Sequence, residues 1–163
     1  MRITEERKGF MVEDIVLGDI IWKNFAGRET EFKPEGTRVF HLKFDQAGAD
    51  FFEAAGITGV KNLKFNEEHD DEPMSHVPVS VTFGDYPPEI YIIVNGRKKR
   101  LTEENVSMLD RCRIIGGDMF ISPWQWKVAN KTGKKLFLRK AYFEIQLDTL
   151  DDKYSSYDDY YDN

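Results

Sequence analysis

Three stretches of the chain interleave aromatic and cationic side chains, and these residue types offer the clearest chemistry in the sequence. They span residues 22–28, 124–135 and 137–142. Lys and Arg side chains neutralise phosphates, and the face of a Trp, Phe or Tyr ring stacks on a base whatever its identity. The combination is typical of a surface that holds a single-stranded nucleic acid, and this is our first hypothesis.

The candidate contacts come from these stretches, from one Arg on a predicted strand and from a basic run after an Asn-Gly turn. They are Trp22, Lys23, Phe25, Arg28, Arg38, Arg97, Lys98, Lys99, Arg100, Trp124, Trp126, Lys127, Lys131, Lys134, Lys135, Phe137, Arg139, Lys140 and Tyr142. Each has a plainer interpretation, because an aromatic ring is as readily a core residue and a basic residue often belongs to a solvated face. Trp22 and Phe25 have opposite parity on one predicted strand, so they should not both point into the core. The run at 97–100 can also be read as a targeting signal.

No catalytic or metal-binding pattern competes with this hypothesis. The chain has no GxSxG, no phosphate-binding loop ending in GK[ST] and no GxGxxG. His69 and His76 flank an acidic run that could bind a divalent ion, but the spacing matches no metal template and an exposed acidic loop is the simpler interpretation. Cys112, the only cysteine, is interpreted as a buried structural thiol. We expect no catalytic activity, no metal and no cofactor.

The net charge of −6 argues at first against a nucleic-acid binder, but the charge is unevenly placed along the 163 residues. Residues 97–147 carry 12 basic and five acidic side chains, for a net charge of +7. Residues 148–163 hold six acids and one base, and residues 67–72 hold five acids without Lys or Arg. A basic segment therefore lies between an acidic loop and an acidic tail.

The tail, residues 148–163, has no apolar periodicity, so we expect it to be disordered. Like charges at a chain end often form an interaction segment, and the candidate partner-binding residues are Asp158, Asp159, Tyr160, Tyr161 and Asp162. The alternative is a solubilising end without a partner. Attraction between the tail and the basic body would make the tail compete with nucleic acid. We therefore divide the chain into a binding domain, residues 1–147, and this tail.

Length and composition favour a single β-rich domain. Domains commonly contain about 100–200 residues, and no apolar run approaches the roughly 18 residues of a membrane span. The N-terminus lacks the apolar region of a signal peptide, and one cysteine cannot form an internal disulfide. Membrane-spanning and secreted classes are therefore excluded, and a reducing compartment is favoured.

Alternation and turn signals predict about eight strands and two short helices without βαβ alternation, which favours an all-β barrel or sandwich. The clearest strand has Phe40, Leu42 and Phe44 on one side. The expected strands are 10–17, 20–25, 37–44, 77–83, 89–94, 97–101, 113–122, 123–130 and 135–147, and the expected helices are 47–55 and one that Thr102 caps. Hairpin turns are expected at Asn95-Gly96 and at 131–134, and a bulge at Gly116-Gly117.

Several short motifs follow one another in a particular order: KNFAGR at 23–28, GxRxF at 36–40, PPEIY at 87–91, LTEENV at 101–106 followed by Leu109-Asp110, SPWQWKV at 122–128, KxG at 131–133 and LFLRKAY at 136–142. This order resembles a family of bacteriophage single-stranded DNA-binding proteins with an OB fold, over about residues 10–154. The resemblance implies an OB-fold-like antiparallel barrel that binds single-stranded DNA without sequence preference, in phage DNA replication, recombination or repair. It also implies an acidic tail that contacts other replication proteins, although this tail ends in Tyr160-Tyr161-Asp162-Asn163 and lacks the terminal Phe of the bacterial type.

Other functions stay open at this point. The chain could be a protein-interaction module or DNA mimic that works through its acidic loop and tail. RNA could replace DNA as the ligand, because stacking and phosphate contacts alone do not read the 2′-OH group. The expected partners are single-stranded DNA and phage or host replication or recombination proteins, in the cytoplasm of a bacterial host cell, with a homodimer as a further option.

Overall fold

The computed structural model describes residues 1–65, 68 and 72–147. The predictions for the tail, and for His69 with Asp70 and Asp71, fall outside these described residues. The described elements, in chain order, are β1 (Arg2–Glu6), β2 (Gly9–Glu13), β3 (Ile20–Asn24), β4 (Val39–Phe44), α1 (Gln46–Ala54), β5 (Lys61–Asn62), β6 (Ser75–Ser80), β7 (Glu89–Val94), β8 (Arg97–Leu101), η1 (Val106–Arg111, a 3₁₀-helix), β9 (Arg113–Val128) and β10 (Lys131–Gln146). The prediction of a mainly β fold with short helices is confirmed.

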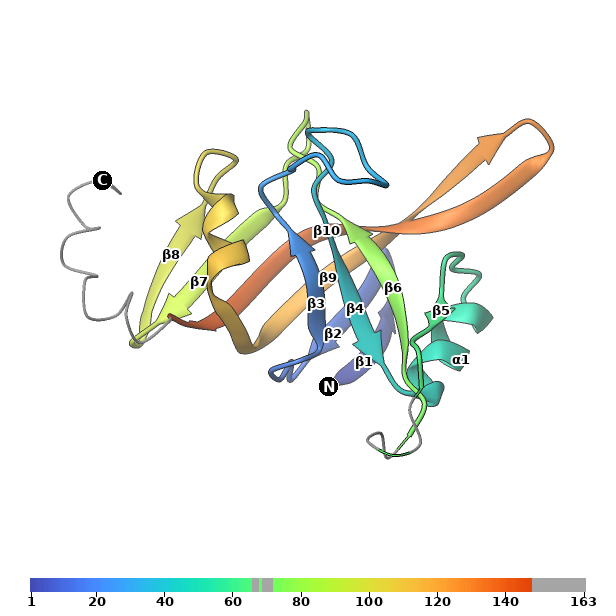
Figure 1. Ribbon diagram of the computed structural model, residues 1–163, viewed down its shortest axis with the longest axis horizontal. Helices are drawn as coiled ribbons and strands as arrows, with labels where there is room; N and C mark the ends of the chain where they lie inside the picture. The colour runs from blue at the N-terminus through green and yellow to red at the C-terminus, as the bar shows by residue number, and fades with distance from the viewer. Residues whose placement is uncertain (66–67, 69–71, 148–163) are drawn as a thin grey trace.

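The strands form one curved sheet whose main path runs β1-β2-β9-β10-β6-β4-β3 (Figure 1). Neighbours are antiparallel except along β10, which pairs in parallel first with β6 and further along with β7. β2 and β3 are consecutive in the chain although β2 lies near one end of this path and β3 at the other. In the connection, the Ile15 N–H donates to the Gly117 carbonyl, and the Asp19 carbonyl accepts from the Lys43 N–H. Within the described residues the barrel is therefore bridged by a loop and not closed by a strand ladder.

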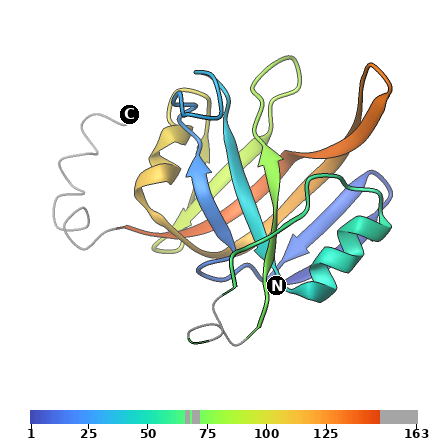
Figure 2. The same cartoon turned by 45° about the vertical axis from the view of Figure 1, so that its right-hand side comes forward.

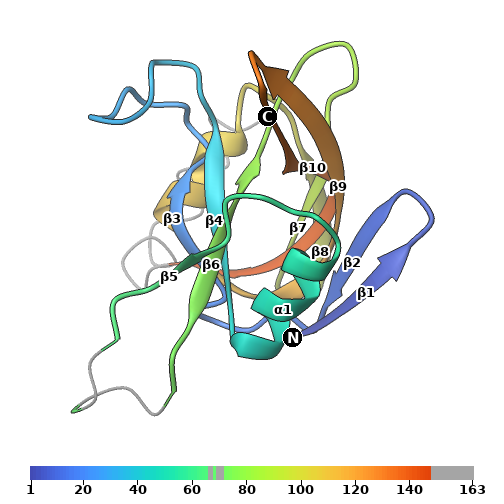
Figure 3. The same ribbon diagram turned by 90° about the vertical axis from the view of Figure 1, so that its right-hand side faces the viewer.

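Two short helices cover the openings that this curvature leaves. η1 contacts both β3 and β9, and Figure 2 shows it beside β3. α1 lies at another end of the sheet, near β5 and β6 (Figure 3), and its Phe52 ring packs edge-on against Phe10. Among the described residues, no helix has the length and apolar character needed to cross a membrane.

The core is built from alternate residues of the strands, as the sequence pattern predicts. Phe40, Leu42 and Phe44 of β4 are buried, with at most 2% of their surface exposed. Phe40 stacks on Phe25 at 5.3 Å between centroids and meets Phe143 edge-on at 6.5 Å. Burying each such side chain stabilises the fold by roughly 1.5–3 kcal/mol, so these rings fix which face of each strand points outward.

β9 and β10 form a long hairpin whose tip projects beyond the barrel (Figure 1). Its turn lies at residues 129–130, where Ala129 has a φ of +54°, so the predicted turn at 131–134 is wrong. The predicted break before Pro123 is also wrong, because Pro123 stays in the strand opposite Leu136. Pro123 lies beyond the part of β9 that pairs with β2, so its missing N–H costs no ladder bond on that edge.

Gly116 and Gly117 form the predicted irregularity in β9. The register with β10 shifts between Glu144 and Ile145 at this point. Gly117 has a φ of +113°, and a Cβ there would lie 1.8 Å from the Tyr142 carbonyl oxygen. Only glycine fits such a close approach of two backbones.

Other elements also differ from their predictions, β1 and η1 among them. β1 was not predicted, because the charged sequence RITEE has no buried face. It is an exposed strand that pairs residue by residue with β2, whose Phe10 and Val12 are in the core. The helix expected from Thr102 starts at Val106 and is a 3₁₀-helix. Thr102 does not cap it: the Thr102 N–H donates to Asn105 Oδ1 at 2.7 Å, which forms a turn in place of a helical start.

Candidate nucleic-acid interface

A groove on the outer face of the barrel collects three exposed or half-exposed aromatic side chains. Its volume is about 470 Å³, and it lies between the β6–β7 connection and the middle of β9 and β10. The lining residues are Thr82, Gly84, Asp85, Tyr86, Ser122, Trp124, Phe137 and Arg139. Three of the predicted contacts thus meet in one place, and Tyr86 joins them without having been predicted.

Strand register turns these side chains outward. Leu136 of β10 points into the core, so Lys135 and Phe137 on either side of it face solvent. Lys135 lies opposite Trp124 of β9, which is 65% exposed, and Tyr86 on the β6–β7 connection is 80% exposed. Rings this exposed present open faces on which a base can stack.

Two cations lie at this groove: Arg139 is part of its lining, and Lys135 lies beside the lining residue Phe137. Lys135 Nζ lies 5.0 Å from the centroid of the Phe137 ring. Arg139 donates from Nη1 to the Tyr86 carbonyl at 3.0 Å, which holds the β6–β7 connection against β10. An Arg has five N–H donors, so this contact leaves others for a phosphate. Asp85 is the one carboxylate in the lining.

The tip of the β9–β10 hairpin carries the next set of predicted contacts. Lys127 and Lys131 are exposed, and Lys134 is half-buried. Trp126 covers its own hairpin, because a Cβ on Gly133 would lie only 2.5 Å from the indole ring. Of the two tryptophans on β9, Trp124 is therefore the one with more ring surface available to a ligand.

A second aromatic cluster lies on the outer face at β3, β4 and β6. Trp22 is 58% exposed and packs edge-on against His41 and His76, at 5.0 and 4.7 Å between ring centroids. The two histidine Nδ1 atoms are 2.9 Å apart, so one ring donates to the other. These histidines were not among the predicted site residues. They meet only because β4 pairs with β6, and no motif in the sequence shows that register.

The outer face is continuous between the two aromatic groups. Ser80 of β6 lies opposite Val39 of β4 on one side and opposite Phe137 of β10 on the other. Trp22 and Trp124 therefore stand on the same curved surface, which crosses β3, β4, β6, β10 and β9.

Both histidines are neutral at pH 7. Burial, and then the charges of His76, Lys33 and Lys61, lower the pKa of His41 to about 4. Burial, followed by the charge of Lys61, also lowers the pKa of His76. The cluster itself is uncharged, and the two lysines are the nearby sources of positive potential.

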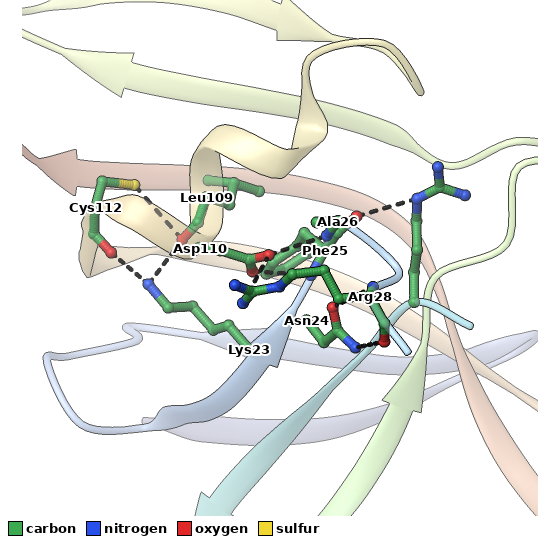
Figure 4. Close-up of polar contacts among 9 residues, drawn as sticks. Lys23, Asn24, Phe25, Ala26, Arg28, Leu109, Asp110 and Cys112 are labelled. Carbon is green, nitrogen blue, oxygen red and sulfur yellow. Dashed lines mark hydrogen bonds and ion pairs between the residues drawn. The ribbon is translucent and has the colours of Figure 1, made fainter. Parts of the chain in front are cut away.

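Some of the predicted contacts hold the fold together instead (Figure 4). Phe25 has no exposed surface and is a core residue, which corrects its prediction as a stacking residue. The Lys23 ammonium donates to the carbonyls of Leu109 and Cys112 at the end of η1, which corrects its prediction as a phosphate contact. Arg38 is largely buried and donates from Nε to the Phe25 carbonyl at 3.0 Å, so it too has a structural role.

Asp110 is the centre of this structural set (Figure 4). Its side chain is 6% exposed and accepts the N–H groups of Phe25 at 2.8 Å and Ala26 at 3.0 Å. Asn24 closes the same loop by donating to the Arg28 carbonyl and accepting from the Arg28 N–H. The Arg28 guanidinium is 71% exposed and lies 3.9 Å from Asp110, so it alone of this motif keeps its charge at the surface.

The remaining predicted residues lie at the other end of β10 from the groove. Arg97 to Arg100 are exposed on β8. Lys98 lies within 5.8 Å of the Tyr142 ring centroid, and Lys140 within 5.5 Å of the same ring. The predicted contacts on β8, β9 and β10 therefore form two groups, one around the groove and one around the β7–β8 hairpin.

One prediction about another side chain can also be compared with the structure. Cys112 is buried, as predicted, and this burial raises the pKa of its thiol. In the part of the chain that the structure describes, no group of three or more His, Cys, Asp or Glu side chains is arranged to hold a metal ion.

A curved, partly open barrel with an aromatic and cationic outer groove is the arrangement of OB-type nucleic-acid-binding proteins. The family model described as "Putative phage ssDNA-binding domain" matches residues 2–160, and the chain belongs to this family. The family resemblance inferred from the order of motifs is thus confirmed.

Two solved structures of the single-stranded DNA-binding protein from bacteriophage Enc34 have a similar fold. The C-terminally truncated form is 9% identical in sequence with a TM-score of 0.52, and the match covers 90% of this chain and 95% of that chain. The form in complex with ssDNA is also 9% identical with a TM-score of 0.52, over 89% of this chain and 93% of that chain. No curated protein matches the chain.

Proposed function

We propose that the protein binds single-stranded DNA without sequence preference along the outer face of its barrel, and that the groove between β9, β10 and the β6–β7 connection is the main contact. The observation that carries the proposal is the exposure of Trp124 and Tyr86 around Arg139. Membership in a phage ssDNA-binding family and a fold similar to one solved with ssDNA support it.

Bases stack on the exposed rings while cations neutralise the backbone. Trp124 and Phe137 offer ring faces, and each stacked base contributes about 1–3 kcal/mol. Lys135 and Arg139 lie beside these rings, and Lys127 and Lys131 continue the positive surface along the hairpin. Four neutralised phosphates on a single strand predict a slope of about −3 for log K against log salt concentration.

Sequence tolerance follows from the kind of contact. The groove is lined by ring faces and by a backbone-bound guanidinium, and a ring face does not distinguish one base from another. Trp22 on the same outer face extends the stacking surface across β6 and β4, with Lys33 and Lys61 nearby. Arg28 adds an exposed cation on the loop after β3.

The role in phage DNA replication, recombination or repair, inside the bacterial host cell, is part of the proposal. So is the division into a binding domain, residues 1–147, and a tail that contacts other replication proteins. The proposal gives the protein no catalytic step. In the tail, Asp158, Asp159, Tyr160, Tyr161 and Asp162 are the partner-binding candidates, and all lie outside the described residues.

A titration of labelled oligo-dT of about 16 nucleotides, the upper end of OB-fold site sizes, tests the proposal. We expect binding at low salt that weakens with a slope near −3, and similar affinity for a mixed-sequence strand. Full-length and tail-deleted protein are compared, because the tail can mask the surface. If neither form binds DNA at low salt, the proposal is wrong. An RNA strand of the same sequence that binds more tightly would change the ligand to RNA.

A further inference from the structure

The four cations of β8 do not lie on one surface, because the strand alternates. Lys98 and Arg100 lie opposite Ile93 and Tyr91 of β7, on the outer face of the sheet. Arg97 and Lys99 lie opposite Val94 and Ile92, on the face that Ile90, Ile92 and Leu101 direct into the core. A run that reads as one basic cluster in the sequence is thus split into two pairs.

The outer pair stands beside two stacked tyrosines. Tyr91 of β7 and Tyr142 of β10 are cross-strand neighbours, with ring centroids 5.0 Å apart and planes within 10° of parallel. Lys98 Nζ lies 5.0 Å from the Tyr91 ring and 5.8 Å from the Tyr142 ring. This arrangement combines aromatic faces and a cation, as the groove does.

Within the described part of the chain, no neighbouring carboxylate neutralises the charge of this outer pair. Among the residues that the structure describes, the ion pairs involve other cations, and no carboxylate lies within 4.0 Å of Lys98 or Arg100. Lys140 differs, because Glu89 Oε2 is 3.8 Å from its Nζ. On the outer face at this end of the sheet, Lys98 and Arg100 are therefore available to a phosphate.

β10 connects the tyrosine pair to the groove. Phe137, Arg139, Lys140 and Tyr142 follow one another along the strand, with a register shift between Leu138 and Lys140 that keeps both Phe137 and Tyr142 off the core side. The five steps along the strand from Phe137 to Tyr142 span about 16 Å at roughly 3.3 Å per residue. A strand of DNA that leaves the groove along β10 reaches the tyrosines.

We propose that Tyr91, Tyr142, Lys98 and Arg100 form a second contact platform for the same DNA strand, so that the binding site runs from the groove along β10 to the β7–β8 hairpin. This inference rests on the proposed function. It adds a consequence for ligand length: a short strand occupies the groove alone, and a longer strand occupies the groove and the platform together.

Two double variants of the same hairpin test this, with equal change in charge. Lys98→Ala/Arg100→Ala removes the outer pair, and Arg97→Ala/Lys99→Ala is the matched control on the opposite face. Binding is measured with oligo-dT of about 6 and about 16 nucleotides over a range of salt concentrations. We expect the outer variant to lower the salt slope by about 1.4 for the long strand, two phosphates at about 0.7 each, and to leave the short strand unchanged. The control should keep the slope of the native protein.

Tyr91→Leu provides a measurement that does not depend on charge. It should weaken binding of the long strand about fivefold or more, which is the lower end of one stacking contact, without changing the salt slope. The inference is wrong if the two double variants lose DNA affinity equally. It is also wrong if the outer variant loses the same affinity for short and long strands, or loses none. If native protein binds neither strand, the proposed function fails and this inference fails with it.

Discussion

Replacing Asp110 with Asn should destabilise the protein far more than an ordinary loss of one surface charge. The Asp110 carboxylate is 6% exposed and accepts two backbone N–H groups, at 2.8 and 3.0 Å. Hydrogen bonds to a charged group contribute about 1.5–3 kcal/mol each. Asn keeps one acceptor and turns an NH₂ group toward the second backbone donor. We therefore expect the free energy of unfolding to fall by about 2–4 kcal/mol. That is a large part of the roughly 5–15 kcal/mol by which a typical domain is stable.

Urea unfolding measures this loss. With a slope of about 2 kcal/mol/M, the midpoint of Asp110→Asn should fall by about 1–2 M. Glu103→Gln is the control, because it removes the same charge from a side chain that is 57% exposed and lies 3.4 Å from Arg38. Exposed pairs contribute about 0–1 kcal/mol, so its midpoint should fall by less than about 0.5 M. Equal shifts for the two variants would refute the structural role given to Asp110.

Three further predictions concern stability and the tail. The low pKa of His41, about 4, and the lowered pKa of His76 keep both rings neutral in the folded protein. In the unfolded chain the same histidines take up protons near pH 6.5. Thermal stability should therefore fall as the pH drops from 6.5 toward 4. A His41→Gln variant with the same decline between pH 7 and 5 would contradict this. Gly117→Ala should lower the free energy of unfolding in urea by about 3 kcal/mol or more, because its Cβ would lie 1.8 Å from a backbone carbonyl oxygen. Gly84→Ala is the control: a Cβ there has nothing within 4 Å, so the free energy of unfolding should change by less than about 0.5 kcal/mol. Deleting residues 148–163 should tighten DNA binding at low salt and have little effect at high salt, where screening is strong; equal affinity at low salt would exclude competition by the tail.

Local patterns predicted the parts of the fold that depend on local physics. The alternation of Phe40, Leu42 and Phe44 predicted a half-buried strand, and all three are in the core. The Asn95-Gly96 pair predicted a hairpin turn, and both residues have the positive φ that such a turn requires, +52° and +73°. Both features depend only on neighbouring residues, so no knowledge of the rest of the chain is needed.

The candidate site was harder to predict, because its geometry depends on register and on irregularities. Trp22 shares its parity with the buried Ile20, which would place it inside. The register with β4 shifts between Ile21 and Asn24, and Trp22 has a φ of +51°, so its ring lies on the outer face. Bulges of this kind re-aim a side chain and are not visible in the alternation pattern.

Composition alone also misassigned part of the site. Lys23 and Phe25 look like a cation beside a stacking ring, but their partners lie on η1 and in the core, more than 80 residues away in the case of Lys23 and Leu109. Tyr86 was missed for the opposite reason, since it stands in a loop without neighbouring cations in the sequence. The fold brings Arg139 to it. Long-range pairing therefore decided which aromatics are exposed to a ligand and which are buried.

The central claim is that single-stranded DNA stacks on the groove formed by β9, β10 and the β6–β7 connection. The most direct test is the affinity of Trp124→Ala for oligo-dT at one fixed low salt concentration, with Leu17→Ala, an exposed apolar residue outside the groove, as control. We predict a loss of about 1–3 kcal/mol for Trp124→Ala, or roughly five- to 150-fold, with native affinity for Leu17→Ala. Native affinity for Trp124→Ala, in a protein that still binds DNA, would contradict the account.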